Sequence, residues 1–290
     1  MTDAALQAAR LVAAMPRLVL DARRIASSVA HGLHGRRRSG IGENFWQYRR
    51  FLGGEPAARV DWRRSARDDH LYVREREWEA AHTVWIWPDL SPSMDYATGR
   101  HPPKRERALV VAFALADLLV RGGERVGVPG LMSPSADRRI VERMAETLAL
   151  APARPASLPP AFAPAPTAEV VLLGDFWTPA TEVAARVEAL ASGGARGHVV
   201  QIVDPAEETF PFSGRIAFSD PEGGERLTVG RAESWRADYE LKLAEHRARI
   251  RACAARHGWS FIVHRTDRPA SALLLALHTR MGPAGAGGPH

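Results

Sequence analysis

The chain has 290 residues, of which 46% are hydrophobic and 25% are charged, as in an ordinary soluble globular protein. This length allows a sizeable core and one or two domains. The single cysteine, Cys253, excludes a disulfide within the chain, and the longest mainly apolar stretch, 108–120, is shorter than the roughly 20 residues of a membrane-spanning helix. Since the N-terminus also lacks the pattern of a secretory signal, we expect a cytoplasmic protein without a membrane span.

Positive charge is concentrated near the start of the chain. The net charge is +6, and of the 39 basic residues only Lys104 and Lys242 are lysines. Residues 1–80 hold 15 arginines against 10 acidic side chains, so they carry most of the excess. A basic segment of this kind can bind an acidic protein surface or nucleic acid.

The N-terminal segment, residues 1–80, is predicted to be helical and extended, and to pack on the rest of the protein. Residues 4–31 indicate one or two amphipathic helices broken near Pro16, because proline lacks the N–H that a helix interior needs. At 45–51, aromatic side chains alternate with arginines. The aromatics could stack on bases, or they could pack inside while the arginines pair with nearby aspartates. The residues that we expect to bind a partner are Arg36, Arg37, Arg38 and Arg49.

The stretch 83–94 is the one around which the chain is organised. Residues 83–88 are largely apolar and rich in β-branched and aromatic side chains, which predicts a fully buried strand. Asp89, Ser91 and Ser93 follow on one loop and offer only oxygen atoms. Such ligands favour a hard cation, Mg²⁺ first, with Ca²⁺ or Mn²⁺ as alternatives. The same pattern is also typical of a turn with a helix cap, since aspartate and serine are favoured there.

Strands and helices alternate after this point, which favours an α/β fold with a parallel sheet and right-handed crossovers. Two further buried strands end on Asp175 and Asp204. Because parallel strands share one carboxyl edge, where open α/β sheets bind ligands, these aspartates and Asp89 should lie on the same rim. The other predicted elements are strands at 71–78, 125–129 and 259–264, helices at 104–120, 136–150, 180–192, 234–257 and 271–281, and a hairpin at 214–229.

Four sequence motifs resemble those of a known family. Asp-x-Ser-x-Ser after a buried strand is similar to the metal-ion-dependent adhesion site of von Willebrand factor type A domains. The motifs Gly-Glu-Asn-Phe-Trp-Gln-Tyr-Arg at 42–49, Val-Asp-Trp-Arg-Arg-Ser-Ala-Arg at 60–67 and Leu-Tyr-Val-Arg-Glu-Arg-Glu at 71–77 resemble the bacterial domain of unknown function family 58, which is itself von Willebrand A-like. The resemblance runs from about residue 22 to about residue 279.

The resemblance implies a fold and a division of the chain. A von Willebrand A-like domain, with a doubly wound, mostly parallel sheet and helices on both faces, is expected at 81–282. A β-hairpin insertion is expected at about 205–232, and a flexible tail at 283–290.

The resemblance also implies a metal site and a partner. The ligands of Mg²⁺, or of another divalent cation such as Ca²⁺ or Mn²⁺, would be Asp89, Ser91, Ser93 and Asp175. A threonine from another loop completes such sites, and the candidates here are Thr147 and Thr167. Asp204 is expected in the turn before Pro205 or in a supporting position, and it is a further possible metal ligand. The implied partner is a MoxR-type AAA+ ATPase that acts as a chaperone in the assembly of other complexes.

We therefore expect a non-enzymatic adaptor that binds a protein carboxylate through the cation. The chain has no Gly-x-Ser-x-Gly motif and no P-loop motif, and its histidines are scattered without the spacing of metal ligands. Two alternatives remain open, a nucleic-acid-binding protein that uses the arginines and aromatics near the start, and a metal-dependent phosphohydrolase.

Overall fold

The computed structural model describes residues 3–34, 45–51, 56, 58, 60–67, 70–76, 82–150 and 156–281. The chain forms two compact units, and the larger contains Met1–Gly35 together with His82–His290. The smaller unit is Arg36–Ala81. The first helix therefore belongs with the α/β body, whereas the sequence predicted one N-terminal segment up to residue 80.

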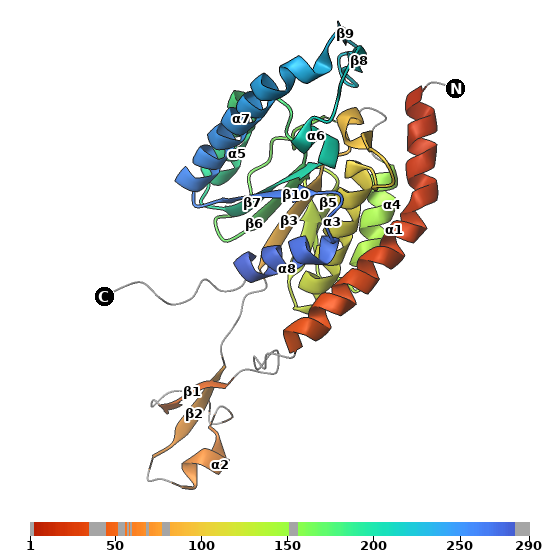
Figure 1. The fold of residues 1–290 in the computed structure, drawn as a ribbon. Coiled ribbons are helices and arrows are strands. Elements are labelled where there is room, and N and C mark those ends of the chain that lie inside the picture. The colour runs from red at the N-terminus through yellow and green to blue at the C-terminus, as the bar shows by residue number, and fades with distance from the viewer. Residues whose placement is uncertain are drawn as a thin grey trace. The chain divides into compact units, whose positions relative to one another are not determined.

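A six-stranded sheet forms the centre of the larger unit (Figure 1). Five of its strands are parallel, and the edge strand β5 is antiparallel to β4. The predicted α/β class with a mostly parallel sheet is therefore confirmed. In spatial order the strands are β10 (Ser260–Arg265), β7 (Arg196–Val203), β6 (Glu169–Gly174), β3 (Thr83–Pro88), β4 (Arg125–Val128) and β5 (Met132–Ser135).

Helices cover both faces of this sheet (Figure 1). Successive residues of a strand point to opposite faces, so Ile86 packs into the core on one side of β3 and Trp87 into the core on the other. The helices on the Ile86 side are α3 (Lys104–Arg121), α4 (Ile140–Ala149), α8 (Ala270–Met281) and α1 (Asp3–His34). Those on the Trp87 side are α5 (Ala180–Ala191) and α7 (Arg236–Arg256).

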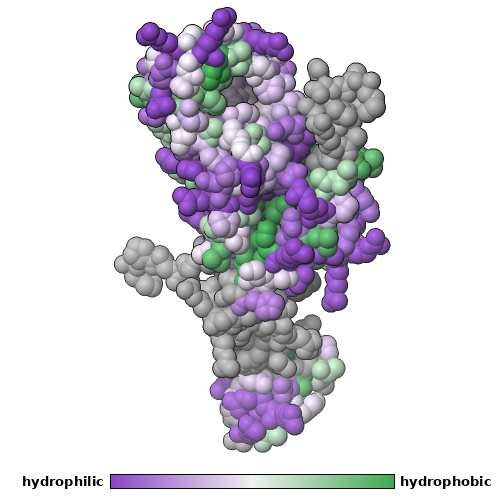
Figure 2. All heavy atoms as spheres, turned by 45° about the vertical axis from the view of Figure 1, so that its right-hand side comes forward, coloured by the Kyte–Doolittle hydropathy of each residue, from purple (hydrophilic) through white to green (hydrophobic). Residues whose placement is uncertain are grey.

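Helix α3 is buried almost all round because it lies between the sheet and α1. The sequence predicted this burial, since the second half of the helix has apolar residues on nearly every side. Ion pairs from Arg17 to Glu106 and from Arg23 to Glu142 join α1 to α3 and α4. Polar side chains cover most of the visible surface of the larger unit, with smaller apolar areas among them (Figure 2).

Helix α1 corrects the prediction of a break near Pro16. It runs without interruption from Asp3 to His34 and includes both Pro16 and Gly32. Proline in a helix interior costs about 3 kcal/mol, and tertiary packing offsets this cost here. The stripe that packs on the rest of the larger unit consists of Met15, Leu18, Ala22, Ala26 and Val29.

The antiparallel edge strand β5 was not predicted. It has only four residues, Met132–Ser135, and it contains Pro134. Proline has no backbone N–H to donate to a neighbouring strand, so within a sheet it is tolerated mainly at an edge. Because proline usually argues against a strand, the sequence did not predict β5. Arg125 donates from its guanidinium to the Pro134 carbonyl over 3.0 Å.

Gly197 in β7 allows the indole of Trp259 to pack on the sheet. A Cβ atom at position 197 would lie 2.4 Å from a carbon of that ring. Trp259 is buried and donates its Nε1 to the Ala195 carbonyl over 2.9 Å, so the ring cannot easily move. We expect Gly197→Ala to lower the free energy of unfolding by about 1–3 kcal/mol because of this overpacking. Urea unfolding would measure it.

Gly230→Ala is the matched control for this prediction, because a Cβ at position 230 would meet no atom within 4 Å. It should change the free energy of unfolding little. If the two variants were equally stable, the close approach of Trp259 to Gly197 would not constrain the fold.

The smaller unit contains an antiparallel pair, β1 (Phe45–Arg50) and β2 (Tyr72–Arg76), and the short helix α2 (Trp62–Ser65). Asp61 caps α2 by accepting from the backbone N–H of Arg64 over 3.0 Å. The strand predicted at 71–78 is present at Tyr72–Arg76, paired with β1 in a sheet of two strands, and residues 77–78 lie outside the described part of the chain.

The remaining elements are short. The predicted hairpin is confirmed as the antiparallel pair β8 (Ile216–Ser219) and β9 (Arg226–Val229). Three single-turn or two-turn helices complete the described fold, namely η2 (Pro92–Asp95), α6 (Pro205–Thr209) and η3 (Ala232–Trp235).

Candidate functional site

Three neighbouring parallel strands bring aspartates to one edge of the sheet. Asp89 follows β3, Asp175 follows β6 and Asp204 follows β7, and the three strands are adjacent in the order β7-β6-β3. The register pairs Pro88 with Leu173, so Asp89 lies beside Gly174. All three aspartates are buried. The common edge that the sequence predicted for them is therefore present.

The loop after β3 turns its polar atoms inward. The backbone N–H of Ser91 donates to Oδ1 of Asp89 over 2.8 Å, and the hydroxyls of Ser91 and Ser93 are 3.2 Å apart. Asp89 is 0% exposed, yet its Oδ2 accepts no hydrogen bond from the part of the chain that the structure describes. A Cβ at Gly174 would lie 3.1 Å from this oxygen, so glycine leaves it room.

The environment of Asp89 disfavours its negative charge. Burial, together with the charge of Asp175, raises the pKa of Asp89 from 3.8 to about 7. The backbone N–H and the hydroxyl of Ser91 both lower the pKa of Asp89, but they are too weak to offset burial. A cation near Asp89 would therefore relieve an uncompensated buried charge.

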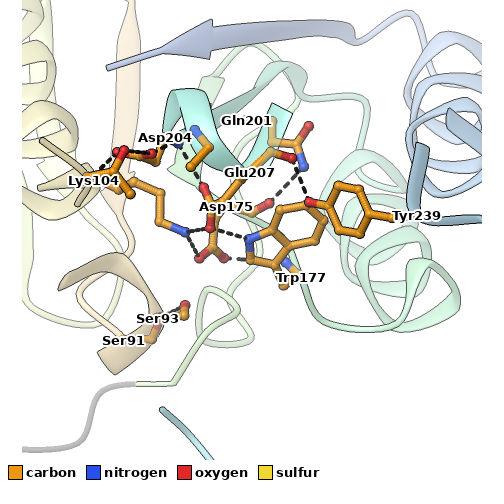
Figure 3. A network of polar contacts seen from close by, with 11 residues as sticks. Ser91, Ser93, Lys104, Asp175, Trp177, Gln201, Asp204, Glu207 and Tyr239 are labelled. Atoms are coloured by element: carbon orange, nitrogen blue, oxygen red, sulfur yellow. Dashed lines mark hydrogen bonds and ion pairs between the residues drawn. The ribbon is translucent and has the colours of Figure 1, made fainter. Parts of the chain in front are cut away.

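Lys104 occupies the centre of the same edge (Figure 3). It is the first residue of α3 and is 0% exposed. Its Nζ donates to Oδ2 of Asp175 over 2.8 Å and to Oε1 of Glu207 over 2.5 Å. One buried ammonium thus binds two carboxylates, one from the end of β6 and one from α6.

The two carboxylates keep Lys104 charged. Burial alone would lower the pKa of the Lys104 amine, but the charges of Asp175 and Glu207 and the hydrogen bonds to them raise it above its usual value. Burial raises the pKa of Glu207, and Lys104 offsets part of that rise. Lys104 and Asp175 therefore form a fully buried ion pair, and Glu207 is a second carboxylate bound to the same ammonium.

Further hydrogen bonds fix the orientation of both carboxylates (Figure 3). Trp177 donates its backbone N–H to Oδ1 of Asp175 over 3.3 Å and its indole N–H to Oε1 of Glu207 over 3.1 Å. Gln201 donates to the Asp175 carbonyl over 2.9 Å, and Tyr239 donates to the Glu207 carbonyl over 2.6 Å. The buried residue between Asp175 and Trp177, Phe176, has a φ of 53°, in the left-handed region that side chains other than glycine seldom adopt.

Asp204 supports the edge as a helix cap. It accepts from the backbone N–H of Ala206 over 2.8 Å and from the backbone N–H and hydroxyl of Thr98. Glu207 accepts in return from the backbone N–H of Asp204 over 2.8 Å, which completes a capping box at the start of α6. This is the turn position that the sequence predicted for Asp204.

The two candidate threonines are not brought to this edge. Thr167 precedes β6 and lies at the amino end of that strand, whereas Asp175 follows its carboxyl end. Thr147 is an exposed residue of α4, and its hydroxyl donates to the Arg143 carbonyl over 2.7 Å. Of the proposed partner-binding arginines, Arg49 lies on β1, and Arg36, Arg37 and Arg38 fall outside the described residues.

The available donors fit a hard cation at Asp89. Within the described ranges, no group of three or more His, Cys, Asp or Glu side chains is arranged to hold a metal ion. A cation at this edge would therefore need the Ser91 and Ser93 hydroxyls in addition to Oδ2 of Asp89. Oxygen donors of this kind suit Mg²⁺, which keeps several waters and uses few protein ligands.

Sequence reasoning missed Lys104 and Glu207. Lys104 is one of two lysines among 39 basic residues, so its presence in an arginine-rich chain was a signal. Glu207 stands three residues after Asp204, the spacing of a capping box, and this pattern could have revealed α6. Neither signal would have shown that the two side chains meet, because 103 residues separate them.

The fold and the edge together define a mixed α/β protein with a buried polar site at the carboxyl ends of its parallel strands. Residues 47–249 match the family described as Protein of unknown function DUF58, and the chain belongs to that family. The predicted resemblance to the domain of unknown function family 58 is therefore confirmed.

The chain is also similar to two mycobacterial proteins. The chain is 28% identical over 282 residues to Uncharacterized protein Rv1480 of Mycobacterium tuberculosis and to Uncharacterized protein Mb1516 of Mycobacterium bovis. In each case the match covers 89% of this chain and 86% of the relative.

Two solved structures are distantly similar. One is an aerotolerance-related membrane protein from Bacteroides fragilis, with 17% identity and a TM-score of 0.42. The other is the conserved hypothetical protein BatB from Bacteroides thetaiotaomicron, with 15% identity and a TM-score of 0.41. Each match covers 69% of this chain and 98% of the other. As for membrane association of the present chain, none of the helices that the structure describes combines the length and apolar content required to cross a bilayer.

Proposed function

We propose that this protein is a non-enzymatic adaptor that binds an acidic group of a protein partner through a divalent cation. The cation, Mg²⁺ or a similar hard ion, is held at the edge formed by Asp89, Ser91, Ser93 and Asp175. The observation that supports this most is Oδ2 of Asp89, which is buried and accepts no hydrogen bond from the described residues. Buried charges are normally paired or bound to a metal.

The charges around the edge favour a cation. Asp89, Asp175 and Glu207 bring three carboxylates to one region, and Lys104 brings one ammonium. Arg105 lies near Asp89 but forms its own ion pair with Asp95 over 3.1 Å and donates to the Leu90 carbonyl. Asp89 is therefore the carboxylate without a direct ion pair among the described residues, and the Arg105 guanidinium acts on it only as a nearby charge.

The binding chemistry follows from the donor set. A divalent cation held by one carboxylate and two neutral hydroxyls keeps a net positive charge and open coordination positions. A carboxylate from a partner protein would fill such a position and complete the neutralisation. No bond needs to be broken for this role, so we assign the protein to binding and not to catalysis.

The proposed partner is the one that the family resemblance implies. The von Willebrand A-like family to which the sequence is similar implies a MoxR-type AAA+ ATPase. The chain contains no P-loop motif, so ATP hydrolysis in this partnership belongs to the other protein. The proposed place of action is the cytoplasm.

A pull-down with the purified MoxR-type ATPase of the same organism tests the proposal. We expect retention in Mg²⁺ and at least about a tenfold loss in chelator or with Asp89→Ala, because the bridge then lacks its metal or its main ligand. Asp238→Ala, which removes an exposed carboxylate from α7, is the control and should bind as the natural protein does. Binding that is indifferent to both chelator and Asp89→Ala would refute the bridge.

A further inference from the structure

Asp175 and Asp89 differ sharply in how their oxygens are used. Oδ2 of Asp175 accepts from Lys104 over 2.8 Å, and its Oδ1 accepts from the Trp177 backbone N–H. Oδ2 of Asp89 accepts from none of the described residues. The sequence motif makes both aspartates candidate metal ligands. In the structure, however, Asp89 is more available to a cation than Asp175 is.

We propose that Lys104 is a built-in counter-ion that competes with the divalent cation for Asp175 and so keeps the affinity for the free cation low. This inference rests on the proposed cation site and describes its regulation. Only Asp89 and the two serine hydroxyls remain as ready ligands, so the cation is held firmly only when a partner carboxylate supplies the missing negative charge. Cation and partner then bind together.

The structure suits an ammonium at this position in particular. Lys104 has a side chain that is 1% exposed, and its Nζ is a compact charge that reaches two carboxylates from different elements. A guanidinium is larger and planar, and it favours two parallel bonds to a single carboxylate. Lys104 is a lysine in a chain that otherwise uses arginine almost everywhere, which fits this steric requirement.

The competition has an electrostatic cause. A cation that approached Asp175 directly would have to displace the Lys104 ammonium or accept a second positive charge close by. Charges at such separations interact strongly inside a protein, where the effective dielectric constant is far below that of water. Removal of the ammonium should therefore strengthen cation binding by much more than a change in a surface charge.

Binding of Mn²⁺, followed by electron paramagnetic resonance as the loss of the free-ion signal, tests this. The informative protein is Lys104→Met/Glu207→Gln, which removes one positive and one negative charge and so leaves the net charge of the edge unchanged. We expect it to bind Mn²⁺ at least about tenfold more tightly than the natural protein. Lys242→Met removes the other lysine, which is exposed on α7, and should leave the affinity unchanged.

Two further proteins make the result decisive. Adding Asp89→Ala to the double variant should abolish the gain, which assigns the bound ion to this edge. Lys104→Gln keeps a hydrogen-bond donor for the two carboxylates. It is used in place of the double variant if circular dichroism shows that the double variant is unfolded. The expected gain for Lys104→Gln is in the same direction.

The outcomes separate this inference from the proposed function. If the folded variant, either Lys104→Met/Glu207→Gln or Lys104→Gln, binds Mn²⁺ no more tightly than the natural protein, the counter-ion role of Lys104 is wrong. This conclusion does not depend on the pull-down. If the variant gains affinity while partner binding by the natural protein ignores chelator, Lys104 is a counter-ion and the metal bridge is wrong.

Discussion

Replacing Lys104 by methionine alone is expected to lower the free energy of unfolding by about 3–5 kcal/mol, the usual cost of breaking a buried ion pair by removing one partner. Methionine fills a similar volume but leaves the buried Asp175 and the partly buried Glu207 without their shared counter-ion. Trp177 still donates to both carboxylates, although neutral donors cannot replace the lost charge. Chemical denaturation at pH 7 in the presence of chelator measures the loss.

Three comparisons check the cause of this loss. Lys242→Met removes an exposed lysine and should cost much less than Lys104→Met. Adding Glu207→Gln to Lys104→Met should recover part of the stability, because one of the two uncompensated charges is gone. The deficit should also shrink at acidic pH, where Glu207, whose pKa burial raises, takes up a proton. A Lys104→Met protein as stable as Lys242→Met would contradict the ion-pair interpretation.

The edge of the sheet could be predicted because local signals determine it. Unbroken apolar runs that end on Asp89, Asp175 and Asp204 indicate buried strands, and the alternation with helices makes those strands parallel. Parallel strands share a carboxyl edge, so the approximate position of each aspartate follows without any knowledge of side-chain contacts.

Side-chain pairing at that edge could not be predicted in the same way. The contact between Lys104 and Glu207 joins the start of α3 to a helix of five residues, and it depends on where the fold places both elements. Sequence spacing carries no information on such a contact. The same reason explains α1, in which packing against α3 overrides the local effect of Pro16.

The candidate metal ligands include residues whose position the sequence could predict and residues whose position it could not. Ser91 and Ser93 lie two and four residues after Asp89, so one loop keeps all three together. Thr147 and Thr167 belong to other parts of the chain, whose position relative to the edge the sequence does not determine, and the structure places neither of them there. Site residues on one loop are thus predictable, whereas those from separate elements require the fold.

Asp89→Asn is expected to stabilise the metal-free protein by about 2–4 kcal/mol at pH 8. The pKa of Asp89 rises from 3.8 to about 7 on folding, because of burial and the charge of Asp175, with a small contribution from Glu222. Each unit of pKa corresponds to about 1.4 kcal/mol between the two protonation states. Asparagine cannot ionise, so this penalty is absent from the variant.

The pH dependence has a defined direction. Below pH 3.8 the carboxyl holds its proton in both the folded and the unfolded protein, and Asp89 costs nothing. Between that value and about pH 7 the unfolded chain loses the proton while the folded protein retains it, so stability falls as the pH rises. Above about pH 7 both forms are ionised and the loss is constant. The advantage of Asp89→Asn should therefore be small at pH 4 and largest at pH 8.

Mg²⁺ should reverse this order, and that reversal connects stability to the proposed function. A cation bound to the ionised Asp89 stabilises only the folded protein, and the gain grows with the concentration of free ion. Asp89→Asn removes the charged ligand, so its unfolding should not respond to Mg²⁺, whereas the natural protein should gain stability at pH 8. Asp238→Asn, an exposed change on α7, should respond as the natural protein does. Unfolding curves of the natural protein that superimpose with Mg²⁺ and with chelator would mean that the buried charge of Asp89 is tolerated without a metal, which would contradict the proposed cation site.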